Sequence, residues 1–477
     1  MARRTKIIAT IGPASSDPVV LRQMIDAGMD VARIGLAHGS LTEAIERYRL
    51  IRQIAAEAGR TVGILVDLPG PKVRLGSFGA GADLVTGSTV ILRPGDGEST
   101  ATNLFVDYEN LLADVHPGDS LAIGDGSARL RIVSVDGDHA KVEVTHGNHV
   151  QGRPGLHVPS DRLGLATPTA EDLYKLDAFV EEGVDMVAVS FVRSAHDLRR
   201  IGTEPYPRGP LVVAKIETRA AVENLAGIIE VAGAVMVARG DLGMELGIEE
   251  LPHIQKRIIR DCIYYGRPAI TATQMLESMI HAPSPTRAEV SDVANAIFDG
   301  SSAVMLSAET AAGHDPVGAI ATMARISERA DAEFDYDGWA RRLRLLRQGA
   351  VGDVETARIT DAMTGAAWRA ATEMGAAAII GLTETGLTVR SIARFRPHMP
   401  ILGFSQNERT VRQLSLSWGT IPLAAPMTND SLELTDTLVV AARDQGHVRS
   451  GDMVAVVAGT GPSRGRVTDL LRLVRVP

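Results

Sequence analysis

Short apolar segments alternate with helical patterns through most of this chain, and this alternation limits the fold more than any other feature. Eight apolar segments of strand length are each followed by a helical pattern, except the third, which is followed by a different kind of sequence. Such runs are typical of parallel strands buried on both faces. Eight of them with returning helices predict an α/β fold, the (β/α)8 (TIM) barrel. The predicted strands are 6–11, 31–36, 62–68, 186–190, 211–216, 235–238, 269–273 and 303–306.

The pattern changes after the third strand and again near residue 335. Residues 70–161 are rich in Gly, Asp and β-branched residues and show the alternation of antiparallel strands, which predicts a small inserted β domain. The barrel would then comprise residues 1–69 and 162–334. Residues 335–477 contain a new series of βα units, which predicts a C-terminal α/β domain with an open sheet.

A lysine and a glutamate stand where the fifth strand should end, at Lys215 and Glu217. Lysine is scarce here, since only six of the 49 basic residues are lysines. A compact, mobile ammonium at a strand end of such an arginine-rich chain is interpreted as functional, serving an anionic substrate beside a metal ion. A surface ion pair is the alternative interpretation.

Polar side chains lie at or just beyond the ends of seven of the eight predicted strands. The carboxyl ends of barrel strands form one rim, and active sites lie there, so these residues predict a catalytic rim. The residues are Arg33, Asp67, Ser190, Arg193, Lys215, Glu217, Arg239, Asp241, Thr273 and Glu309.

The rim residues have a consistent chemistry. Glu217 and Asp241 come from adjacent strands, so their carboxylates can share one divalent cation, Mg²⁺ or Mn²⁺. Lys215 and Arg33 provide positive charge for a phosphoryl group. Gly240 lies in a tight turn that opens toward a helix, where bare amides bind a carboxylate or phosphate. The rim therefore predicts a small, phosphorylated, doubly anionic substrate bound with the metal ion.

Composition argues against several other functions. A net charge of −9 disfavours a nucleic-acid surface. A single cysteine, Cys262, excludes an intramolecular disulfide and suits a reducing compartment. The sequence contains neither a signal-peptide pattern nor an apolar run of the roughly 18 residues that a membrane helix needs. We expect a cytoplasmic protein without a nucleic-acid or membrane partner.

A series of motifs resembles the pyruvate kinase family over nearly the whole chain. The resemblance implies transfer of a phosphoryl group from phosphoenolpyruvate to ADP, giving pyruvate and ATP. It also implies that the inserted domain is a small β-barrel lid, that the C-terminal domain serves regulation or oligomerisation, and that the protein is a homotetramer. The motifs are Thr5–Ala14, Ala32-Arg33 with His38-Gly39, Gly70–Arg74, Ala214–Glu217, Met236–Gly243, Ala272–Met279, Pro285–Asn295 and Val304–Thr310.

The resemblance implies roles for the charged residues at matching positions. Glu217 and Asp241 resemble the Mg²⁺ ligands of the family. Lys215 resembles the cation that stabilises the phosphoryl group in transfer, and Arg33 resembles the arginine that binds the substrate phosphate. Arg74 resembles a phosphate contact at the lid hinge, which places it among both the catalytic and the nucleotide-binding residues.

The resemblance also implies how the substrate carboxylate and the nucleotide are bound. The amides of Gly240 and Asp241, with the side chain of Thr273, resemble the carboxylate site, and Thr273 matches a residue implicated in protonation of the enolate. His38 and Arg153 are the further nucleotide-binding candidates. Arg153 stands one residue away from the family's lysine position, so the choice of phosphoryl acceptor is less determined than substrate binding.

The chain departs from the family at the monovalent-cation site. Positions that supply K⁺ ligands in the family are occupied here by Gly35, Ala37 and Leu68, and of these ligands only Asp67 remains. One carboxylate does not build a K⁺ site. Lys72 stands where K⁺-dependent members carry glutamate and K⁺-independent members carry lysine. We predict that K⁺ is not required and that Lys72 supplies the missing charge beside Asp67.

A loop of the C-terminal domain resembles the hydroxyl-rich loop that holds an effector phosphate. It contains Thr383, Thr385, Gly386 and Thr388, and a loop of this composition can cradle an anion. The segment 460–466 adds two arginines. An ordinary turn between strand and helix is the alternative interpretation.

Two other functions fit the same rim. A Mg²⁺-dependent barrel lyase or aldolase acting on pyruvate enolate needs the same metal and carboxylate pocket, but no ADP site. A catalytically weak paralogue could bind metabolites and regulate a partner. The lid and Lys215 favour the kinase, because a lyase needs no cation for a phosphoryl group.

Overall fold

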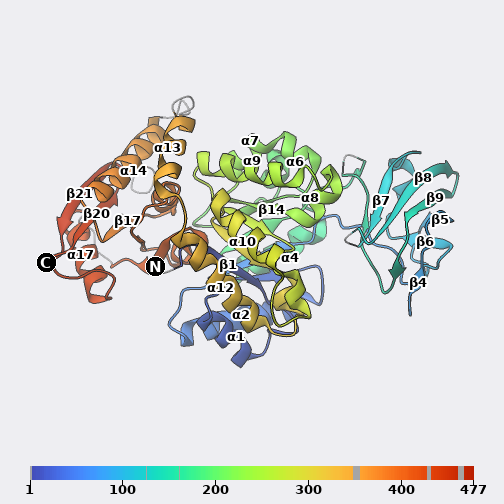
Figure 1. The fold of residues 1–477 in the computed structure, drawn as a ribbon, viewed down its shortest axis with the longest axis horizontal. Helices are drawn as coiled ribbons and strands as arrows, with labels where there is room; N and C mark the ends of the chain where they lie inside the picture. The colour runs from blue at the N-terminus through green and yellow to red at the C-terminus, as the bar shows by residue number, and fades with distance from the viewer. Residues whose placement is uncertain (1–2, 125, 161, 348–354, 427–430, 460–466) are drawn as a thin grey trace.

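The computed structural model describes residues 3–124, 126–160, 162–347, 355–426, 431–459 and 467–477. The molecule has three parts in a row (Figure 1). A barrel lies in the centre, the inserted domain extends from one side of it, and the C-terminal domain lies on the opposite side, next to the N-terminus. In the described residues, no helix is both long enough and apolar enough to cross a membrane.

Eight parallel strands form a closed barrel, as the alternation predicts. The order around the barrel is β1-β16-β15-β14-β13-β12-β3-β2. The strands consist almost entirely of buried residues, which explains why they appear in the sequence as continuous apolar runs rather than alternating ones. The bounds are β1 Lys6–Thr10, β2 Val31–Gly35, β3 Gly63–Leu68, β12 Met186–Val189, β13 Leu211–Ile216, β14 Ala234–Ala238, β15 Ala269–Ala272 and β16 Ala303–Leu306.

Helices connect these strands and cover the outside of the barrel. Three of the long ones begin with a capping box, in which Ser40, Thr169 or Thr286 exchanges hydrogen bonds with the acidic residue three positions later. The bounds are α1 Pro18–Asp26, α2 Leu41–Glu57, α4 Ala170–Glu181, α5 Ala195–Arg199, α6 Arg219–Glu223, α7 Leu225–Val231, α8 Arg239–Leu246, α9 Leu251–Tyr264, η1 Glu277–Ile280, α10 Arg287–Asp299, α11 Ala308–Ala311 and α12 Pro316–Ala332.

The inserted residues form a separate sheet with its own core. Six strands pair in the order β11-β7-β8-β9-β5-β6, antiparallel except for β5 and β6, and a further pair joins β10 to β4. Leu92, Leu130 and Val142 are fully buried in this core, so the domain packs around itself rather than against the barrel. The bounds are β4 Ala82–Asp83, β5 Thr89–Pro94, β6 Asn103–Val106, α3 Leu111–Asp114, β7 Ser120–Ile123, β8 Ala128–Asp136, β9 His139–His146, β10 His149–Val150 and β11 Leu156–His157.

The C-terminal domain is an open five-stranded sheet in the order β19-β18-β17-β20-β21. The sequence analysis missed both edge strands. β19 contains Pro422, which weakens the strand pattern, and in β21 the arginines Arg472 and Arg475 interrupt the aliphatic residues at a half-exposed edge. Residues 460–466 lie outside the described residues. The bounds are α13 Tyr336–Arg347, α14 Glu355–Glu373, β17 Ala378–Leu382, α15 Leu387–Ala393, β18 Ile401–Ser405, α16 Glu408–Gln413, η2 Leu414–Leu416, β19 Thr420–Ala424, α17 Ser431–Asp444, β20 Met453–Ala458 and β21 Leu470–Arg475.

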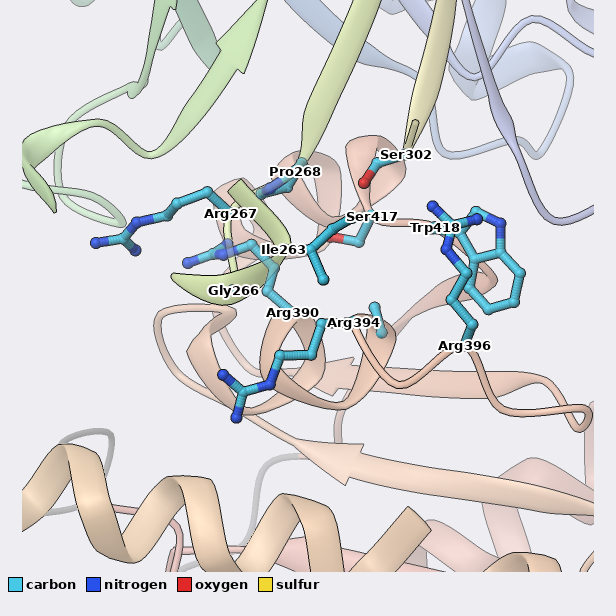
Figure 2. A pocket seen from close by; sticks show the side chains of 11 residues that line it. Ile263, Gly266, Arg267, Pro268, Ser302, Arg390, Arg394, Arg396, Ser417 and Trp418 are labelled. Atoms are coloured by element: carbon cyan, nitrogen blue, oxygen red, sulfur yellow. The ribbon is translucent and has the colours of Figure 1, made fainter. Parts of the chain in front are cut away.

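Arginines join the C-terminal domain to the barrel (Figure 2). Arg396 donates to the carbonyl of Ser301 (2.9 Å) and stacks on the ring of Trp418, 4.6 Å from its centroid. Arg4, before β1, donates to the carbonyl of Met399 (2.8 Å). Burial lowers the pKa of Arg396 to about 10, so the guanidinium stays charged at neutral pH. Backbone carbonyls and aromatic faces, rather than carboxylates, are thus its main partners at this joint.

Candidate active site

The end of β13 carries a dense set of polar contacts at the barrel rim. Lys215 Nζ donates to Ser190 Oγ (2.7 Å) and lies 2.8 Å from Glu217 Oε1 and 3.3 Å from Asp67 Oδ1. Its side chain is only 13% exposed. Burial alone would lower the pKa of Lys215, but Asp67 and Glu217 outweigh burial and raise it above the ordinary lysine value. Lys215 is therefore a fixed, permanently charged ammonium at the barrel mouth.

Arg33, in the middle of β2, extends this cluster on the other side of Asp67. Arg33 Nε pairs with Asp67 Oδ2 (2.7 Å), and Arg33 Nη1 donates to Thr10 Oγ1 (3.0 Å). The register that places Thr10 opposite Arg33 in the β1–β2 pair explains the second contact. Burial would raise the pKa of Asp67, but Lys215 and Arg33 together hold it below its usual value. Asp67 is thus an ionised carboxylate that already binds two cations.

Glu217 and Asp241 provide the negative charge on the adjoining side of the mouth. Glu217 is buried, and its Oε2 accepts a hydrogen bond from the Phe191 amide (2.7 Å). Burial raises the pKa of Glu217, Lys215 opposes that shift, and Asp241 adds to it. Two carboxylates that come from adjacent strands fit a divalent cation. The described residues include no cluster of three or more potential metal ligands, so a cation here would need further ligands from substrate and water.

Thr273 and Gly240 meet at the next part of the mouth. The Gly240 amide donates to Thr273 Oγ1 (2.9 Å), which itself donates to the Ala272 carbonyl (2.7 Å). β14 ends at Ala238 and α8 begins at once, so Gly240 and Asp241 lie in the first turn of a helix, where amides without helical partners favour an anion. Thr273 has a φ of +67°, which is rare for a β-branched residue.

The hinge of the inserted domain borders the same mouth. Lys72, Gly155 and Phe191 line a cavity of about 170 Å³ together with Asp241. Lys72 is exposed, and its Cε would lie 3.1 Å from a Cβ placed on Gly155, so glycine leaves room for the lysine chain. The contacts of Asp67 with Lys215 and Arg33 place those two cations, rather than Lys72, against this carboxylate.

The candidate nucleotide residues lie around this hinge. Arg74 pairs through its backbone with Gly155, and its amide donates to Asp107 Oδ1 (2.6 Å). Arg153 is half-exposed and pairs with the other oxygen of Asp107 (3.0 Å). His38 is exposed; partial burial, together with Arg74 and Lys72, lowers its pKa, so the imidazole is neutral at physiological pH. Asp107 therefore links Arg153 to the Arg74 backbone within the inserted domain.

The threonine-rich loop lies in the C-terminal sheet, apart from the barrel rim. Gly386 has a φ of +81° and precedes α15, and its amide donates to Thr383 Oγ1 (2.9 Å). Thr388 Oγ1 lies 2.8 Å from the hydroxyl of Thr468. Thr385 Oγ1 accepts a hydrogen bond from the amide two residues on (3.4 Å). The hydroxyls of this loop thus help to fix its own conformation.

The sequence analysis missed two functional contacts. It assigned Ser190 to the rim without a partner, and the structure makes it the hydrogen-bond acceptor for Lys215. It named no polar residue for the first strand, yet Thr10 ends β1 and binds Arg33. The rule that selected the other rim residues would have selected Thr10 too. Glu309, by contrast, is buried and accepts hydrogen bonds from the amides of Leu276 and Ser307, so it fixes the loop after β15.

The fold and the rim define the class of the protein, a (β/α)8 barrel enzyme with charged side chains gathered at the carboxyl ends of its strands. Residues 2–320 match the family model described as pyruvate kinase, barrel domain, and residues 361–474 match pyruvate kinase, alpha/beta domain. The chain belongs to the pyruvate kinase family, whose members transfer phosphate from phosphoenolpyruvate to ADP and generally use Mg²⁺.

Known proteins of this family match the chain over its full length. A pyruvate kinase from Clostridium acetobutylicum is 36% identical over 99% of both chains. One from Geobacillus stearothermophilus is 39% identical over 99% of this chain and 80% of its own length. The crystal structure of a pyruvate kinase from Cryptosporidium parvum covers 100% of this chain and 96% of its own, with a TM-score of 0.88 and 31% sequence identity.

Proposed function

We propose that this chain catalyses Mg²⁺-dependent phosphoryl transfer from phosphoenolpyruvate to ADP at the barrel rim described above. The observation that carries the assignment of the site is Lys215, a buried ammonium held by Asp67, Glu217 and Ser190. A fixed cation of this kind stabilises charge on a phosphoryl group without reorganising during the reaction. Family membership supports the choice of substrates.

Different residues at the rim bind different parts of the substrate. An ADP oxygen attacks the phosphorus, the bond from phosphorus to the enol oxygen breaks, and the enolate then takes a proton at carbon. Lys215 and Arg33 bind the phosphoryl group, while the amides of Gly240 and Asp241 and the hydroxyl of Thr273 orient the substrate carboxylate. Glu217 and Asp241 would hold Mg²⁺ (or Mn²⁺), which supplies Lewis-acid neutralisation of phosphoryl charge. The enolate proton would pass close to the Thr273 hydroxyl.

A coupled assay for ADP-dependent pyruvate formation tests the function directly. We expect turnover that requires phosphoenolpyruvate, a nucleoside diphosphate and Mg²⁺ together, and measurements with several diphosphates define the acceptor that Arg74, Arg153 and His38 select. Pyruvate production without any nucleotide would instead identify a lyase of pyruvate enolate. Binding of phosphoenolpyruvate without turnover would identify a regulatory paralogue.

We also propose that the enzyme works without K⁺. Gly35, Ala37 and Leu68 offer no side-chain oxygen, and Asp67 already binds Arg33 and Lys215. Lys72 borders the same mouth and would add the positive charge that K⁺ contributes in other members. Equal activity in K⁺ and in tetramethylammonium at the same ionic strength is the expected result, and strong activation by K⁺ would reject the proposal.

Three further properties are proposed. We infer that the protein is cytoplasmic, since its single cysteine suits a reducing compartment. We also infer that it is a homotetramer, because apolar Val290 and Phe298 are partly exposed beside an apolar groove of about 350 Å³ between α10 and α12. The loop from Thr383 to Thr388 is proposed to bind an anionic effector. Light scattering of the purified enzyme tests the tetramer, and activity titrations with sugar phosphates and nucleotides test the effector.

A further inference from the structure

Arg239 is a buried arginine beside the substrate pocket that has no role in the reaction described above. It is the first residue of α8, directly before Gly240, and only 7% of it is exposed. Its guanidinium contacts the turn that follows β15. Nη2 donates to the carbonyl of Thr273 (2.7 Å) and to that of Gln274 (3.2 Å). Nε lies 3.3 Å from the carbonyls of Ala272 and Thr273.

The turn that Arg239 holds is strained. Thr273 and Gln274 are consecutive residues with φ values of +67° and +54°, and only two other non-glycine residues in the described part of the chain have positive φ. Such conformations persist only where the surroundings enforce them, and they concentrate at functional sites. The two carbonyls that accept hydrogen bonds from Arg239 Nη2 belong to the two strained residues themselves. Arg239 therefore opposes relaxation of this turn.

A second pair of contacts fixes Arg239 itself. Arg239 Nη1 lies 2.7 Å from Asp292 Oδ2, a carboxylate of α10 that is 39% exposed. The same nitrogen lies 3.5 Å from Gln255 Oε1 on α9. A guanidinium has five donors in a rigid fork, so it can bind carbonyls on one side and a carboxylate on the other, which an ammonium cannot do in one geometry. The contacts form a chain from α10 through Arg239 to Thr273.

We propose that Arg239 and Asp292 are positioning residues that set the Thr273 hydroxyl for substrate binding and enolate protonation. Arg239 directly precedes Gly240, whose amide donates to the Thr273 hydroxyl. The Arg239 side chain also binds the Thr273 carbonyl, so Arg239 connects the Gly240 part and the Thr273 part of the carboxylate pocket. The pair does not touch substrate and acts through Thr273. This inference rests on the proposed assignment of Thr273 to the pocket. The experiment below tests the positioning role of Arg239 and Asp292 separately from that assignment.

Asp292→Asn and Arg239→Lys test the proposal, with Thr273→Ala as the reference. Since a misplacement of about 1 Å can reduce a rate by about 100-fold, we expect kcat to fall about 10-fold in Asp292→Asn and about 100-fold in Arg239→Lys. The KM for ADP should stay unchanged. Solvent-deuterium exchange into pyruvate, which reports the protonation step alone, should fall in parallel. Asp261→Asn on α9, which removes a carboxylate 3.2 Å from Arg260 on the outer surface, is the matched control and should change neither.

A double-mutant comparison decides whether the pair acts through Thr273. In the Thr273→Ala background, Asp292→Asn should have no further effect on kcat. An equal loss in both backgrounds would overturn the proposal, and so would a lower melting temperature with unchanged kcat for the folded enzyme. If Arg239→Lys fails to fold, Asp292→Asn still tests the proposal, because Asp292 is partly exposed. An active Thr273→Ala enzyme would instead refute the assignment of Thr273, and the inference would fall with it.

Discussion

Two lysines border the mouth of the barrel, and the structure holds them in very different ways. Lys215 stands at the end of a barrel strand, with three partners within 3.3 Å. Lys72 lies on the hinge of the inserted domain, is exposed, and packs its chain over Gly155. Both are proposed to serve the same anionic substrate. The first is placed by closure of the barrel, whereas the position of the second depends on how the inserted domain sits over the mouth.

This difference shows what each part of the molecule contributes. Strands β3, β12 and β13 are neighbours in the barrel, and their register brings Asp67, Ser190 and Lys215 together before any ligand arrives. Such preorganised charge suits the phosphoryl-transfer step. A residue on a hinge can change its distance from substrate, which suits substrate entry and release. Replacements on the strand should therefore affect chemistry more than replacements on the hinge.

Lys215→Met should have the largest effect. Removing a preorganised charge that faces the reacting group lowers rates by about 100- to 1,000-fold, so we expect kcat to fall by about 1,000-fold. Steady-state rates per folded enzyme measure this, with melting curves as the check on folding. Lys256→Met is the matched control, because Lys256 is an exposed lysine on α9 that pairs with Asp299. If kcat fell only modestly in Lys215→Met, Lys215 would not contribute more to catalysis than Lys72 does.

Glu217→Gln should have the next largest effect, chiefly on metal binding. We expect the Mg²⁺ concentration for half-maximal activity to rise at least about 10- to 100-fold, the loss typical of disturbed metal sites. Melting curves with and without Mg²⁺ give an independent measure of metal binding. Glu182→Gln, which removes an outer carboxylate paired with Arg49, should leave both measurements unchanged. An unaltered Mg²⁺ requirement in Glu217→Gln would exclude Glu217 as a ligand.

Lys72→Glu should reduce activity less, by about 10-fold, because a hinge cation contributes less than a fixed one. Added K⁺ should not rescue the variant, since Gly35, Ala37 and Leu68 still lack ligand oxygens. Rescue is expected only when Gly35→Asn, Ala37→Ser and Leu68→Thr are combined with Lys72→Glu. K⁺ titrations of both variants measure this difference, and K⁺ rescue of the single variant would show that Lys72 is not the substitute.

The smallest expected effect is that of pH on the stability that the Asp67–Lys215 pair contributes. The pKa of Asp67 is lowered, so its stabilising contribution is present above the unfolded value of about 4 and is lost only as pH falls through the lower folded pKa. The pKa of Lys215 is raised, so its contribution is present below about 10.4 and is lost only as pH rises through the higher folded pKa. The decrease in melting temperature caused by Asp67→Asn should therefore be the same at pH 5 and pH 9. A difference between the two would mean that the pair titrates in this range.

Much of the fold was predictable because local patterns and global topology agree. The strand 211–216 was predicted with the bounds that the structure has, since a buried parallel strand is a continuous apolar run. β21 was missed, because at the half-exposed edge of a sheet its arginines break the apolar run. α8 was missed as well, since Gly240 and Gly243 lower helix propensity and resemble a turn.

The sequence by itself determined which residues reach the barrel rim, because strand periodicity and the ends of parallel strands follow from local chemistry. Only the tertiary structure decided their partners. Asp67 looked like the remnant of a K⁺ site, yet it binds Arg33 from the neighbouring strand β2 and Lys215 from β13, which β12 separates from β3 in the barrel. Arg239 looked like another rim cation, but its guanidinium turns to the strained carbonyls after β15 and to Asp292. Side-chain direction depends on packing between segments distant in sequence, and no local pattern encodes it.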